Sequence, residues 1–124
     1  MFKGFILSES LKNPLILNDL KAGFVRVEKR SESKEFPFWY LFVVEFKDED
    51  VKNSIKLISG NLKYGWYAHF WDESVVYICF LDKIFKVPRE QGRGWKSDEF
   101  KAAIEYGAKN GVDPIYFSDF WIED

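Results

Sequence analysis

The sequence contains one cysteine, one histidine and one methionine, and it has no long apolar run. With Cys79 alone no internal disulfide can form, which is typical of proteins in a reducing compartment. A zinc site of the usual types is not expected, because His69 and Cys79 are too few to supply its His and Cys ligands. The apolar stretch at the N-terminus is too short for a signal peptide, and no run approaches the roughly 18 apolar residues of a membrane span. We therefore expect a cytoplasmic protein without metal or cofactor and without membrane contact.

The chain also lacks a strong excess of charge of either sign. Its 18 basic and 20 acidic residues give a net charge of −2 and a pI near 5.5. No global positive field therefore attracts nucleic acid or an anionic membrane. The segment 63–70 is similar to the basic-glycine-aromatic signature of RNA-binding sheets, but a residue intervenes between Lys63 and Gly65. We expect no nucleic-acid partner, and an RNA-binding module is the third functional hypothesis.

Aromatic residues, in contrast, are abundant. The chain has thirteen Phe, six Tyr and five Trp in 124 residues. Its length predicts one domain over residues 1–124, and a domain of this size has too much surface for its volume to bury every ring. The surplus rings are expected to line a cleft or an interface. Because two-fold pairing is the commonest way to cover such a patch, we expect a homodimer.

The pattern of apolar residues predicts an alternation of strands and helices. Strands are expected at 2–7, 24–30, 38–46, 66–71, 75–81, 84–87 and 115–117, and helices at 14–20, 49–62 and 98–108. Asp48 and Ser97 are the expected N-caps of the second and third helices, Gly23 the expected end of the first, and the aromatic residues 120–122 are expected to pack onto the body.

This order predicts an α+β fold. It suits a ferredoxin-like split βαβ arrangement, in which both long helices lie on one face of an antiparallel sheet. An N-terminal strand-helix-strand would extend that sheet. A less specific α+β sandwich is the alternative.

Three segments carry a resemblance to known proteins. Residues 3–11 (KGFILSESL), 65–71 (GWYAHFW) and 83–89 (KIFKVPR) are similar to landmarks of a family of small prokaryotic proteins without an established function. These segments are not catalytic signatures. The resemblance implies a stand-alone domain and implies no mechanism.

The first candidate site lies on the strand predicted at 66–71. Tyr67, His69 and Trp71 alternate along it and so share one face. His69 is able to serve as a lone general base, but its neighbours favour a half-buried packing residue. Cys79 lies among apolar residues and is expected to be a buried, inert thiol, although His69 could face it across the predicted hairpins.

The second candidate site is the loop 88–96. Arg89, Arg93 and Trp95 accompany two glycines and lead into the predicted cap Ser97. Guanidinium groups beside the unpaired N–H groups of a helix N-terminus are suited to an anion. A solvated connecting loop is the alternative interpretation.

Together these patterns predict a small binding or interaction domain for an anionic small molecule or a protein partner. The expected ligand-binding residues are Tyr67, His69, Trp71, Arg89, Arg93 and Trp95. The alternative function is a small enzyme that uses His69 with nearby carboxylates.

Overall fold

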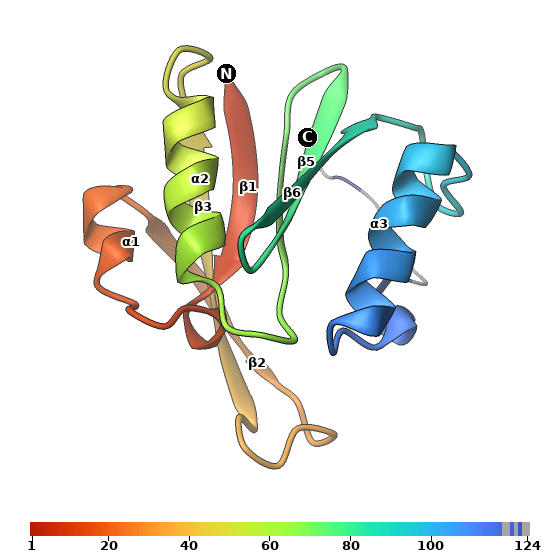
Figure 1. Cartoon of the computed structure of the whole chain (residues 1–124). Coiled ribbons are helices and arrows are strands. Elements are labelled where there is room, and N and C mark those ends of the chain that lie inside the picture. Colours follow the sequence, from red (N-terminus) through yellow and green to blue (C-terminus); the bar gives the residue numbers. More distant parts are fainter. Residues whose placement is uncertain (118–119, 121, 123–124) are drawn as a thin grey trace.

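The computed structural model describes residues 1–117, 120 and 122, and shows a mixed α+β fold (Figure 1). In this part of the chain an antiparallel six-stranded sheet has the order β2-β3-β1-β4-β5-β6. Its strands are β1 (Phe2–Leu7), β2 (Gly23–Lys29), β3 (Phe38–Phe46), β4 (Ala68–Trp71), β5 (Val75–Phe80) and β6 (Lys83–Pro88). The helices are α1 (Ile16–Asp19), α2 (Val51–Asn61) and α3 (Asp98–Lys109), with 3-10 turns at Ser8–Ser10 and Pro114–Phe117.

Strand β1 forms the centre of the sheet. Both β3 and β4 pair antiparallel with it, so they run parallel to each other, and α2 connects them. Gly4 of β1 lies opposite Phe70 of β4, and a Cβ atom at position 4 would overlap the Phe70 ring and the carbonyl oxygen of His69. The central pairing therefore depends on a glycine at this position.

The sheet carries a hydrophobic core on each face. Side chains alternate between the faces along a strand, and Phe70 belongs to one core while the adjacent Trp71 belongs to the other. The first core contains Ile55 and Ile58 of α2, and the second contains Phe100 and Ala103 of α3. Helices α2 and α3 therefore cover opposite faces, and Figure 1 shows β5 and β6 between them.

The ferredoxin-like arrangement expected from the sequence is not confirmed. That arrangement requires both long helices on one face and a final strand after the last helix. Instead α3 lies on the face opposite α2, and residues Pro114–Phe117 form a 3-10 turn. The physical reason is visible in β5, where Ile78 is buried on one face and Cys79 on the other, so each face needs its own cover.

Most predicted element positions agree with the structure. The nine-residue strand β3 has the expected bounds, and the Ser97 side chain accepts a hydrogen bond from the Phe100 N–H as the cap of α3. At α2 the N-cap is Asp50, whereas the Asp48 carboxylate pairs with the N-terminal amine. Lys21, with φ of 53°, provides the left-handed turn after α1, so Gly23 begins β2 instead of ending the helix.

The C-terminal residues partly follow the expectation. Phe120 is buried in the second core and Ile122 packs against it, whereas Trp121 lies outside the described residues. Among the described helices none is both long and apolar enough to cross a membrane.

Candidate functional site

A cleft of about 650 Å³ lies on the face of the sheet that carries α3. Helix α3 packs against β6 and covers only one end of this face. The rest of the same face, over β1, β2, β3 and the start of β4, is open and forms the floor of the cleft. Residues 64–67 and 111–116 complete the walls. Ligand sites in proteins have volumes of about 300–1,000 Å³, so this cleft has the size of a small-molecule site.

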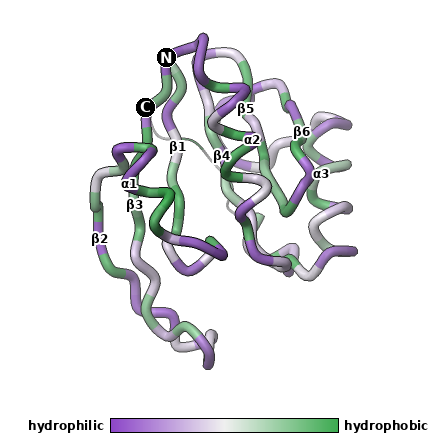
Figure 2. The backbone as a smooth tube through the Cα atoms, turned by 60° about the vertical axis from the view of Figure 1, so that its left-hand side comes forward, coloured by the Kyte–Doolittle hydropathy of each residue, from purple (hydrophilic) through white to green (hydrophobic). Residues whose placement is uncertain are grey.

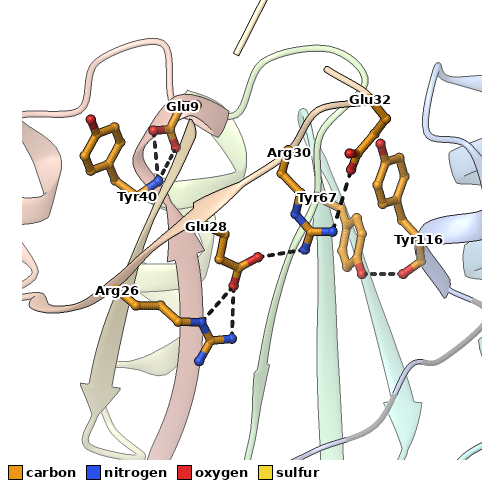
Figure 3. Close-up of polar contacts among 8 residues, drawn as sticks. All are labelled: Glu9, Arg26, Glu28, Arg30, Glu32, Tyr40, Tyr67 and Tyr116. Carbon is orange, nitrogen blue, oxygen red and sulfur yellow. Dashed lines mark hydrogen bonds and ion pairs between the residues drawn. The ribbon is translucent and has the colours of Figure 1, made fainter. Parts of the chain in front are cut away.

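One wall of the cleft is aromatic. The ring of Trp39, which is 8% exposed, lies 5.3 Å from that of Trp66 and 6.0 Å from that of Tyr116, measured between centroids. Phe36 packs edge-on against Trp66 at 5.8 Å. The hydroxyl of Tyr67 donates a hydrogen bond to the Tyr116 carbonyl oxygen at 3.1 Å, which ties the 3-10 turn to the cleft (Figure 3). Flat, rigid rings of this kind offer stacking surface at low entropic cost.

The adjacent wall is charged and comes from alternate residues of β2 and the turn after it. The Glu28 carboxylate accepts hydrogen bonds from Arg26 Nε at 3.0 Å and from Arg30 Nη2 at 2.7 Å (Figure 3). The Arg30 guanidinium also lies 4.6 Å from the centre of the Trp39 ring, in a cation–π contact. Arg30 Nη1 also lies 3.7 Å from the Glu32 carboxylate, so Arg26, Glu28, Arg30 and Glu32 form an ion-paired cluster of two guanidinium groups and two carboxylates (Figure 3).

Two buried donors lie where the two walls meet, and neither has a hydrogen-bond partner. Within the part of the chain that the structure describes, Arg30 Nε and Trp39 Nε1 are both shielded from solvent and make no hydrogen bond. An unsatisfied buried donor costs about 1–3 kcal/mol, and such groups are rare in folded proteins. Both residues line the cleft, so a ligand with acceptor atoms at this point would supply the missing hydrogen-bond partners.

His69 and Tyr67 form part of the cleft, and His69 is enclosed by rings. The imidazole stacks with Tyr67 at 6.1 Å and with Trp71 at 5.3 Å, and Phe120 lies 4.9 Å away. Burial lowers the pKa of His69 to about 4 and raises the pKa of Tyr67 well above its usual range. Both side chains are therefore neutral at neutral pH.

Cys79 does not face His69. The thiol is fully buried in the first core, on the face of α2, whereas His69 lies on the other face. Burial raises the pKa of the Cys79 thiol to about 12, which makes it inert as a nucleophile. No group of three His, Cys, Asp or Glu side chains among the described residues is arranged to hold a metal ion.

The residues of the predicted loop site lie outside the cleft. Arg89 Nη1 donates a hydrogen bond to the Asp72 carbonyl oxygen at 2.8 Å, and the buried Trp95 donates through Nε1 to Gly92 at 2.9 Å. The Glu90 carboxylate accepts from the backbone N–H groups of Lys96 and Ser97 at 3.0–3.2 Å. The chain's own carboxylate therefore occupies the two N–H groups that directly precede α3.

Of the six predicted site residues, the structure brings Tyr67 and His69 into the cleft. Trp71 and Trp95 are buried in the second core, and Phe120 lies between Trp95 and His69, with its ring 5.1 Å from that of Trp95. Arg89 and Arg93 are not part of the cleft lining.

Sequence reasoning missed the cleft residues of other segments. The principal ones are Arg26, Arg30, Trp39, Trp66 and Tyr116. The available signal was the alternation of Arg26, Glu28 and Arg30, which places three charges on one face of a strand.

The chain matches no protein-family model, and it matches neither a curated protein nor a solved structure. Its similarity to the small prokaryotic family therefore stays a prediction.

Proposed function

We propose that this protein binds a small organic anion with a flat ring system in the cleft between β2 and residues 111–116. The observation that carries the proposal is the pairing of an aromatic wall with two unsatisfied donors in a cleft of about 650 Å³. Small-molecule sites are typically apolar with a few convergent polar groups, and this lining follows that pattern.

The two walls suggest how such a ligand would be held. The ring system would lie against Trp39, Trp66 and Tyr116, where stacking and apolar burial supply most of the affinity. The acidic group would pair with Arg30 in place of its contacts with Glu28 and Glu32, because a guanidinium can offer two parallel N–H donors to a carboxylate or phosphate. The Arg30 side chain is 38% exposed, so it can turn from the Trp39 ring toward a ligand without opening the core.

The experiment is a calorimetric titration with three groups of compounds. Aromatic carboxylates and nucleotides carry both a ring and an anionic group, phosphate and acetate carry only the charge, and indole carries only the ring. We expect measurable binding for members of the first group alone. Failure of every ring-containing anion in the panel to bind would contradict the proposal.

Two matched variants then distinguish the cleft from the loop. Arg30→Gln removes a guanidinium from the cleft, and Arg93→Gln removes one from the loop 88–96. We expect Arg30→Gln to weaken binding by about tenfold or more, as loss of a charge-assisted hydrogen bond implies, and Arg93→Gln to leave it unchanged. The reverse result would assign the ligand to the loop.

A further inference from the structure

We propose that a second copy of this chain pairs with β2, so that the sheet continues across a two-fold axis at Val27. The inference is independent of the ligand proposed for the cleft. It depends on the exposure of β2, on the direction of its backbone groups and on the order of its charges.

Strand β2 is a long open edge of the sheet. It is last in the strand order, and six of its seven residues are exposed, Glu28 being the exception. Figure 2 shows β2 at one margin of the molecule and α3 at the other. Natural proteins usually blunt such edges because an open strand recruits another strand.

The edge is also apolar. Phe24 and Val27 of β2 are 58% and 47% exposed, and Phe38 and Tyr40 of the adjacent β3 are 49% and 44% exposed. The register pairs Val27 with Tyr40 and Phe24 with Phe42, so the four exposed side chains lie on the face of the sheet that carries α2. They extend beyond the area that α2 covers. Their burial against a second copy would supply affinity at about 25 cal/mol per Å².

The backbone of Val27 points outward, toward the open edge. Arg30 N donates to the Pro37 carbonyl oxygen at 2.7 Å, and antiparallel pairing repeats this orientation at every second residue, so Glu28 and Arg26 also bond toward β3. In agreement, the N–H of Tyr40, opposite Val27, donates away from β2 to the Glu9 carboxylate at 3.0 Å (Figure 3). The Val27 N–H and C=O are thus positioned for a second strand.

The charges favour a pairing centred on Val27 over one centred on Arg26 or on Glu28. An antiparallel pair centred on Val27 sets Arg26 opposite the partner's Glu28, and Glu28 opposite the partner's Arg26. Centring the axis on Arg26 or on Glu28 would instead oppose like charges, which is unfavourable. Exposed ion pairs contribute little affinity, so their effect here is on alignment.

The first test uses complementary charge variants in analytical ultracentrifugation. We expect the wild-type chain to form dimers at micromolar to millimolar concentration. The single variants Arg26→Glu and Glu28→Arg should each dimerise at least about tenfold more weakly, because each substitution places like charges opposite each other at two positions of the interface. An equimolar mixture of the two variants should form heterodimers, since both cross-strand pairs are then complementary. Leu57→Asp, an exposed leucine on α2, is the matched control and should dimerise like the wild type.

The second test is Val27→Pro. Proline lacks the N–H that faces the open edge but leaves the bonds between β2 and β3 in place, so the monomer should melt normally while the dimer is lost. A wild-type chain that is monomeric at every concentration would overturn the proposal and leave the edge to a strand of another protein. A dimer that persists in Val27→Pro, or variants that do not associate when mixed, would overturn it too.

Discussion

Acidification should destabilise the protein through His69. The folded chain holds this imidazole neutral with a pKa of about 4, against 6.5 in the unfolded chain. Between these values the unfolded state binds more protons, so stability falls as the pH is lowered from 6.5 and levels off below 4. At about 1.36 kcal/mol per pKa unit the upper limit is about 3 kcal/mol. His69 borders an open cleft, where water reduces the penalty, and we therefore expect a loss of about 2 kcal/mol.

The assay is urea denaturation at pH 7 and pH 4.5, for the wild type and for His69→Phe. Phenylalanine keeps a ring between Tyr67, Trp71 and Phe120 but cannot be protonated, while the carboxylates of the two proteins titrate alike. The wild type should lose about 2 kcal/mol more than the variant over this interval. Equal losses in both proteins would show that His69 titrates as a solvated residue, and the hypothesis of a catalytic base would then gain support. At pH 7, His69→Ala should cost about 1–3 kcal/mol, since it leaves a partial cavity.

Three further predictions follow from the core. Gly4→Ala should lower the free energy of unfolding by about 3 kcal/mol or prevent folding, because the new methyl group overlaps the Phe70 ring and a backbone oxygen, and a chain that melts like the wild type would refute this. Ser59→Ala should cost about 1–2 kcal/mol in the same urea assay, because the buried Ser59 hydroxyl donates to the Phe80 carbonyl oxygen at 2.6 Å. Cys79 should react with a thiol reagent in denaturant only, and rapid labelling of the folded protein would contradict its burial.

The local features of the fold were predictable from the sequence. The run of β-branched and aromatic residues at 38–46 predicted β3 with its correct bounds. Ser97 was recognised as a cap because its side chain bonds to a backbone N–H only three residues away. The alternation of Tyr67, His69 and Trp71 predicted correctly that their rings share one face. In each case the interaction joins residues close together along the chain, so the pattern itself contains the information.

The hydrogen-bond partners within the loop 88–96 were not predictable without the tertiary structure. The glycines, the two arginines and the helix N-terminus were all correctly identified, but the sequence analysis did not consider that Glu90 would accept hydrogen bonds from the N–H groups of Lys96 and Ser97, just before the helix. Its carboxylate reaches them only because the loop folds back on itself. Residue types alone do not show whether these N–H groups bind the chain's own carboxylate or an external anion. Both acceptors have the same chemistry, and the loop geometry decides between them.

The residue types and their spacing were sufficient to predict the α+β class, the position of each long helix and the burial of the Cys79 thiol. The face covered by α3 was not predictable, because an amphipathic helix buries the same apolar area against either side of a sheet. The cleft depended on that choice: with α3 packed over β6, the rings of Trp39, Trp66 and Tyr116 come together from segments far apart in the sequence. Long-range packing of this kind selects among arrangements that satisfy the same local preferences, and for this reason the site emerged from the folded chain alone.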